Sequence, residues 1–134
     1  MPEFLYWNKE STYSGIKTVL IVEDDPDIGE MLVEILLAET PYQVKLIQDA
    51  STAREIVRTL TPQLVILDYL LPHMDGVACL DALRARKGLE RVPAIIMSAN
   101  LPKRVRERTD VLLVEKPFDL YQFVALVMQV LETE

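Results

Sequence analysis

The feature that most constrains the fold is an alternation of short apolar runs with stretches of helical periodicity. Five runs have strand length, at residues 19–22, 43–47, 64–67, 93–97 and 111–114. Apolar residues at spacings of three and four follow every run except the fourth. Continuous apolar runs are typical of strands buried on both faces, and alternation with helices favours a mostly parallel sheet covered on both sides.

We therefore expect an α/β fold with a doubly wound, five-stranded parallel sheet. The flavodoxin-like strand order 2-1-3-4-5 is one of the two common arrangements for such a chain, and it is the order we predict. In the second run, Val44 and Leu46 alternate with polar residues, which favours an edge position for that strand. The order makes the first and third strands central neighbours.

The length of 134 residues suits a single domain. Residues 1–15 have no clear period but carry several aromatic side chains, so they form either a loosely ordered tail or an aromatic arm that packs on this domain or on a partner. We predict a tail over residues 1–15 and one domain over residues 16–134.

Composition excludes several classes of protein. The net charge of −7 argues against direct binding of nucleic acid or of an anionic membrane surface. The sequence has no apolar run of about 18 residues and no signal-peptide pattern, so we expect a cytoplasmic protein. Cys79, the single cysteine, lies in an apolar helical pattern and is expected to be a small buried side chain. With one histidine, His73, the chain has no set of ligands for a transition metal.

Polar side chains stand at the carboxyl ends of four of the five predicted strands. Glu23 and Asp24 follow the first strand, Asp68 ends the third, Ser98 ends the fourth and Lys116 follows the fifth. Ligands of open α/β sheets bind beyond the carboxyl ends of the strands, so these residues mark the expected site. Asp25, followed by proline, is assigned to the N-cap of the first helix.

Crowded carboxylates repel one another unless a cation lies between them, and a hard divalent ion relieves the repulsion. Mg²⁺ takes one or two carboxylates, keeps several waters and leaves positions for phosphate oxygens. We predict Asp24 and Asp68 as direct ligands and Glu23 as a ligand through water. The main-chain carbonyl of Leu70 is the candidate for a further ligand.

Four segments resemble receiver domains of two-component response regulators. They are VLIVEDD at 19–25, LVILDYLLPHMDG at 64–76, MSA at 97–99 and EKPF at 115–118. The similarity extends over about residues 17–132, and the second segment, with proline and glycine four and eight residues past Asp68, is the most specific.

The resemblance implies that Asp68 accepts a phosphoryl group, with Mg²⁺, from a histidine kinase or a phosphotransfer protein. It implies that Ser98 donates a hydrogen bond to the phosphoryl group and that Lys116 pairs with it. Glu23 and Asp24 would form the acidic metal site, and the Lys116–Pro117 peptide bond would be cis. Apart from this self-phosphorylation and its slow reversal, no enzymatic activity is expected.

The sequence departs from the receiver pattern in two places that bear on signalling. The position three residues before Lys116, where receivers commonly carry an aromatic residue, is Leu113. Only 17 residues separate Ser98 from Lys116, about one helical turn fewer than usual. The segment 102–110 is basic and has no apolar stripe, so the fourth helix should be short, shifted or irregular. Its basic side chains form either a solvated face or a docking patch, and the face for signal output is altered.

Other functions remain open from sequence. Because the chain stops soon after the fifth helix, it would be a stand-alone regulator, a relay intermediate or a fragment of a longer protein, with an output partner that the sequence does not name. A degenerate receiver would bind proteins without being phosphorylated. A flavodoxin-like nucleotide binder is disfavoured because the acids at 23–25 would repel phosphate, and an aspartate phosphatase is disfavoured by Leu70, where a second acid is usual.

Overall fold

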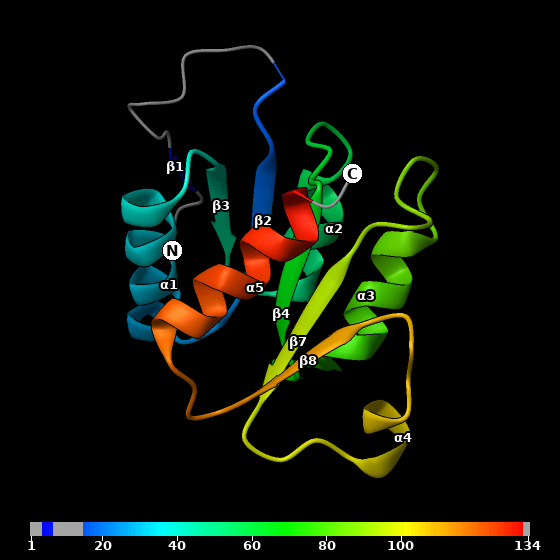
Figure 1. The fold of residues 1–134 in the computed structure, drawn as a ribbon. Coiled ribbons are helices and arrows are strands. Elements are labelled where there is room, and N and C mark those ends of the chain that lie inside the picture. The colour runs from blue at the N-terminus through cyan, green and yellow to red at the C-terminus, as the bar shows by residue number, and fades with distance from the viewer. Residues whose placement is uncertain (1–3, 7–14, 133–134) are drawn as a thin grey trace.

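The sheet lies at the centre of the molecule, with its strands running side by side (Figure 1). The computed structural model describes residues 4–6 and 15–132. Six strands form the main sheet in the order β1-β3-β2-β4-β7-β8. Their bounds are β1 Phe4–Tyr6, β2 Thr18–Val22, β3 Gln43–Ile47, β4 Leu64–Asp68, β7 Ala94–Ser98 and β8 Leu112–Glu115.

The five parallel strands follow the predicted order. β3, β2, β4, β7 and β8 correspond to the second, first, third, fourth and fifth strands of the sequence-based prediction, and every neighbouring pair among them is parallel. The predicted flavodoxin-like arrangement is therefore confirmed.

The strand β1 adds a neighbour that the sequence did not predict. It pairs antiparallel with β3, with Phe4 opposite Leu46 and Tyr6 opposite Val44. The edge position predicted for β3 is therefore wrong, although β3 is the outermost of the parallel strands. Gln43 and Lys45, the polar residues that suggested an edge, are 4% and 8% exposed. The division of the chain at residue 15 stays a prediction, since residues 1–3 and 7–14 lie outside the described part.

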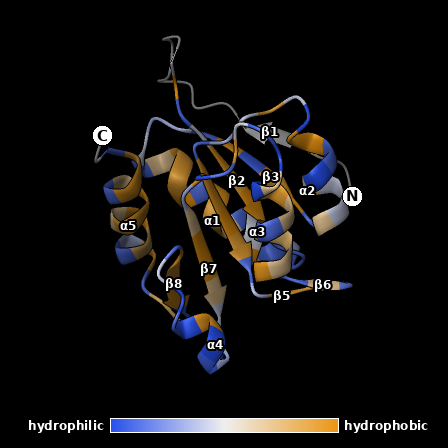
Figure 2. Cartoon of the chain, turned by 90° about the vertical axis from the view of Figure 1, so that its right-hand side faces the viewer, coloured by the Kyte–Doolittle hydropathy of each residue, from blue (hydrophilic) through white to orange (hydrophobic). Residues whose placement is uncertain are grey.

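Helices cover both faces of the sheet and divide the core into two layers. Helices α1 (Pro26–Glu39) and α5 (Leu120–Glu132) pack on one face, and α2 (Ala50–Ile56) and α3 (Gly76–Arg84) pack on the other (Figure 1). Successive residues of the central strands β2 and β4 belong to opposite core layers, so each strand contributes apolar side chains to both. Figure 2 shows hydrophobic residues along the strands of the sheet. Cys79 is fully buried in the α3 layer, as predicted.

Aspartate side chains cap the N-termini of four helices, with Asp119 before α5 as one of them. The side chain of Asp25 accepts hydrogen bonds from the backbone N–H groups of residues 27 and 28, as predicted for the start of α1. Asp49 and Asp75 cap α2 and α3 in the same way. Each cap satisfies N–H groups that have no partner within the helix. The starts of α1 and α3 are thereby fixed next to the carboxyl ends of β2 and β4.

The fourth helix is short, as predicted. Helix α4 (Lys103–Arg106) has four residues and follows Pro102, which offers no side-chain cap. Val105 is its one buried residue. One apolar side chain anchors little helix to a core, because most helical stability in proteins comes from packing of an apolar face. None of the helices in the described residues is long and apolar enough to cross a lipid bilayer.

A small hairpin follows the end of β4. Its strands are β5 (Leu70–Leu71) and β6 (Met74–Asp75), and His73 in the turn has a φ of 66°. The N–H of Gly76 then donates to the carbonyl of Tyr69 at 2.7 Å. A Cβ at Gly76 would collide with the carbonyl oxygen of Asp68, so glycine is required for this close approach of two backbone segments. The hairpin thus returns the chain to the carboxyl end of β4, where Asp68 lies.

Candidate functional site

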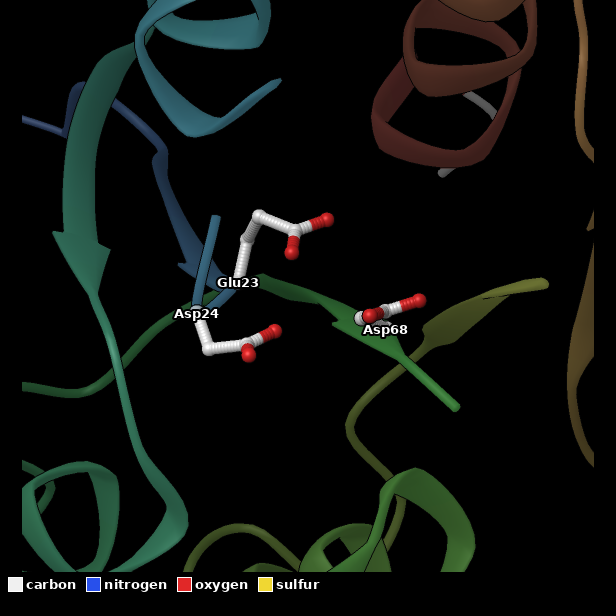
Figure 3. A group of neighbouring side chains, drawn as sticks. All are labelled: Glu23, Asp24 and Asp68. Atoms are coloured by element: carbon white, nitrogen blue, oxygen red, sulfur yellow. The ribbon is translucent and has the colours of Figure 1, made fainter. Parts of the chain in front are cut away.

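Three carboxylates meet where β2 and β4 end. Glu23 and Asp24 follow β2, Asp68 is the last residue of β4, and these two strands are direct neighbours in the sheet. One oxygen from each residue lies within 4.8 Å of the others. Figure 3 shows the Glu23 and Asp24 side chains projecting from the end of β2 beside Asp68. The structure therefore brings together the three acids that the sequence placed in one site.

Glu23 is the most buried member of the cluster. The residue is 1% exposed, and its Oε2 accepts a hydrogen bond from the N–H of Asp25 at 3.1 Å. Burial, opposed by this hydrogen bond and reinforced by the negative charge of Asp68, raises the pKa of Glu23 to about 7. Asp24 by contrast is exposed to solvent. The cluster is therefore closed on the side of Glu23 and open on the side of Asp24.

Lys116 provides the cation that faces these acids. Its Nζ donates to Oδ1 of Asp68 at 3.1 Å and lies 3.5 Å from Oε1 of Glu23. Burial alone would lower the pKa of Lys116, but the attraction of Glu23 and Asp68 outweighs it and raises the pKa above its ordinary value. The ammonium group is therefore charged and shared between two carboxylates. The Lys116–Pro117 peptide bond is cis, as predicted.

Asp68 itself is 7% exposed. Burial raises the pKa of its carboxyl above the ordinary value; the Lys116 ammonium opposes this shift and Asp24 adds to it. Its Oδ1 accepts the hydrogen bond from the Lys116 ammonium. A partly shielded carboxylate paired with a cation is suited to act as a nucleophile toward an anionic group, because the cation reduces the repulsion.

Ser98 lies at the end of β7, one strand beyond Asp68. The residue is 3% exposed, and its Oγ accepts a hydrogen bond from the N–H of Asn100 at 3.1 Å. Since this bond uses the oxygen as acceptor, the hydroxyl proton remains available for donation. The N–H of Lys116 donates to the carbonyl of Ser98 at 2.9 Å, which places these two residues side by side on neighbouring strands.

Leu70 begins β5, and the residue is 70% exposed. It is thus the most exposed of the large apolar residues in the described chain and lies two residues past Asp68. The role of its carbonyl as a metal ligand stays a prediction.

Sequence reasoning missed two contacts that frame the site. Arg104 of α4 donates to the hydroxyl of Tyr69 at 3.3 Å, and Tyr69 directly follows Asp68. Tyr69 packs in the same core layer as Val105 and the partly buried Leu113. Because the contacts join residues distant in sequence, no local pattern signals them. They connect α4 to the segment that carries Asp68.

The acidic cluster fits a hard divalent cation. Three carboxylates converge from two strands, and the buried Oε1 of Glu23 has no hydrogen bond within the described part of the chain, although Lys116 lies 3.5 Å away. The cluster has more carboxylate oxygens than hydrogen-bond donors, and Mg²⁺ binds carboxylate oxygens by preference.

Fold and site together define a class of protein: an open α/β domain with a buried carboxylate, an acidic pair, a serine and a lysine at the carboxyl ends of neighbouring strands. The family model for the response regulator receiver domain matches residues 19–128. The chain belongs to this family, and it is a receiver domain of two-component signalling.

Relatives of two kinds contain a similar segment. The DNA-binding response regulator MtrA of Mycolicibacterium smegmatis is 41% identical over 81 residues, covering 60% of this chain and 34% of MtrA. The sensor histidine kinase TmoS of Ectopseudomonas mendocina is 31% identical over 115 residues, covering 81% of this chain and 11% of TmoS. The chain therefore spans only part of the length of each of these relatives.

Solved structures show the same fold. The receiver domain of a signal transduction histidine kinase from Syntrophus aciditrophicus has a TM-score of 0.75 and 30% identity, and the match covers 87% of this chain and 90% of that one. The receiver domain of the sensor histidine kinase PA1611 from Pseudomonas aeruginosa, described with a magnesium ion coordinated in the active site cleft, has a TM-score of 0.74, 24% identity and coverage of 89% and 100%.

Proposed function

We propose that Asp68 accepts a phosphoryl group from a phosphohistidine of a histidine kinase or a phosphotransfer protein. The observation that carries this function is the position of the Asp68 carboxylate, 3.1 Å from the Lys116 ammonium and within 4.8 Å of the Glu23 and Asp24 oxygens. In that position a cation and an acidic cluster flank one nucleophilic group.

The reaction would proceed by attack of an Asp68 oxygen on phosphorus. The bond from phosphorus to the donor imidazole nitrogen breaks, and an acyl phosphate forms on Asp68. Phosphoryl transfer depends mainly on positioning and charge neutralisation. Asp68 is positioned as the last residue of β4, and the backbone of Gly76 packs closely against its carbonyl group.

Glu23, Asp24 and Asp68, together with the carbonyl of Leu70, would hold Mg²⁺, which neutralises negative charge on the transferred group and on the carboxylates. The presence of magnesium in the PA1611 receiver supports this assignment. Lys116 offsets the charge that the phosphoryl group brings, which is about −1.5 to −2 for phosphorylated side chains. Ser98 offers its hydroxyl proton to a phosphoryl oxygen.

The proposal is tested by intact-protein mass spectrometry after incubation with Mg²⁺ and acetyl phosphate. One added phosphoryl group is expected, and Asp68→Asn should abolish it. Asp25→Asn is the matched control, since it removes one neighbouring negative charge while asparagine remains a good N-cap. The control should be phosphorylated like the parent protein.

A degenerate receiver that binds proteins without phosphorylation is the second candidate. Leu113 in place of the usual aromatic residue and the four-residue α4 favour it, because both lie on the face that would report phosphorylation. Absence of any added phosphoryl group with EDTA-free Mg²⁺ and with a phosphorylated kinase domain would favour this second function. A cytoplasmic location, a single domain over residues 16–134 and an output protein or domain of unknown identity complete the proposal.

A further inference from the structure

A basic groove runs between α2 and α3, away from the acidic site. It has a volume of about 550 Å³, and its lining includes Arg54, Arg58, Arg86 and Lys87, with Glu55 as the one acidic residue. The chain has 14 basic residues and a net charge of −7, so four of the cations gather in one groove of an acidic protein. Figure 2 shows α2 and α3 as neighbours on the same side of the sheet.

The contacts within the groove leave most of its positive charge uncompensated. Arg58 pairs with Glu55 at 3.1 Å, with both side chains largely exposed, and Arg86 donates to the carbonyl of Arg58 at 3.2 Å. Arg54 and Lys87 are exposed. An exposed pair such as Arg58–Glu55 contributes little to stability because solvent screens it, so a partner carboxylate can replace Glu55 easily.

From this charge distribution we infer that the α2–α3 groove is a docking surface for a short acidic segment of a partner protein. A groove between two helices receives an extended or helical segment along its length. The buried Val57 and Leu83 line the groove as well. Of the cations, Arg54 belongs to α2 and Arg58 to the turn after it, and Arg86 and Lys87 follow α3. Several carboxylates of one segment would meet several cations at once.

Other anionic ligands fit the groove less well. A single small anion would remain solvated, because the cationic side chains are exposed instead of enclosed; the Arg58 side chain is 63% exposed. A long nucleic acid would extend past the groove over the rest of an acidic surface and be repelled there. A short acidic segment gains the attraction without the repulsion.

The inference is tested with a fluorescein-labelled oligoglutamate peptide and ¹⁵N-labelled protein at low salt. On addition of the peptide, changes in the amide chemical shifts measured by NMR are expected in α2, α3 and residues 86–87. The double variant Arg54→Glu/Lys87→Glu should weaken binding by about tenfold or more in anisotropy titrations. Both residues are exposed at the surface, so the folded structure should be retained, which thermal unfolding checks.

The matched control is Arg91→Glu/Arg106→Glu, which changes the net charge by the same amount at exposed sites outside the groove. It should alter the affinity by no more than about twofold. Equal weakening by both double variants, shift changes outside the groove or no binding of the peptide would overturn the inference. Tighter binding of a single-stranded oligonucleotide or of anionic vesicles through the same residues would overturn the assignment to an acidic protein segment. Because phosphorylation of Asp68 is assayed separately, the result is independent of the proposed function.

Discussion

At the scale of single residues, the site contains a buried acid, Glu23, whose pKa lies near neutral pH. Burial holds the pKa of Glu23 at about 7 against an ordinary value of 4.5. The folded state therefore binds this proton more tightly than the unfolded state, and stability falls as the pH rises from 4.5 to about 7. An acid kept in this condition serves the site, at the expense of stability.

Replacing Glu23 with glutamine should remove that cost. With EDTA present and at about pH 8, Glu23→Gln is expected to raise the free energy of unfolding by about 1–3 kcal/mol, and the difference should shrink as the pH approaches 4.5. Denaturant unfolding at several pH values measures it. Glu115→Gln, at an exposed glutamate, is the control and should have little effect; a difference for Glu23→Gln that is the same at every pH would contradict the explanation.

Gly76 is a second single residue on which the site depends. A Cβ there meets backbone atoms of Asp68 and Tyr69, which cannot move aside as a side chain can. Gly76→Ala should therefore destabilise the protein by about 1–3 kcal/mol and slow phosphorylation of Asp68. Gly29→Ala is the control, because its Cβ meets only the flexible end of Leu46. In thermal unfolding, Gly76→Ala should have the lower Tm of the two variants. Equal Tm values would refute the prediction.

At the scale of elements, an arginine anchors the loop that leads into β8. Arg84 at the end of α3 donates twice to the carbonyl of Val92, at 2.7 and 3.2 Å, and also to the carbonyl and carboxylate of Asp110. Arg108 pairs with Asp110 and Asp81, so the basic segment after α4 is tied to α3. The predicted choice between a solvated face and a docking patch for this segment omitted this structural role.

Loss of the hydrogen bonds from the Arg84 guanidinium to Val92 and Asp110 should make the loop before β8 more mobile. Arg84→Ala is expected to cost about 1–3 kcal/mol of stability, because three backbone and carboxylate acceptors lose a planar donor. Arg84→Lys should recover little, since an ammonium cannot reproduce these hydrogen bonds. Hydrogen exchange at β8 would report the loosening, and unchanged protection in both variants would rule the anchor out. Lys103→Ala, at an exposed ion pair, is the control.

At the scale of the whole molecule, strand β1 completes one side of the sheet. It pairs with β3 along Phe4–Tyr6, so deleting residues 1–14 uncovers a five-residue strand. Unpaired edges invite pairing with other chains. The shortened protein should unfold cooperatively at a lower Tm and show faster amide exchange in β3. A deletion of residues 1–3 alone should leave both properties unchanged, and an unaltered Tm after the longer deletion would show that β1 adds nothing.

The order of the parallel strands and the acidic site were predictable from sequence, because buried strands leave continuous apolar runs and Glu23, Asp24, Asp68 and Lys116 follow those runs directly. The short α4 was predictable for the converse reason, the lack of an apolar stripe. By contrast, β1 has three residues and exists by pairing with a distant strand. The Arg84 hydrogen bonds and the raised pKa of Glu23 depend on tertiary neighbours, which local patterns do not encode.

The length of α4 limits how a change at the site can travel. With four residues and a rise of about 1.5 Å per residue, the helix is about 6 Å long. A helix this short cannot convert a small displacement at Ser98 into a larger movement at its far end. A partner that reads this side of the domain would have to sense a local rearrangement within one turn of the site.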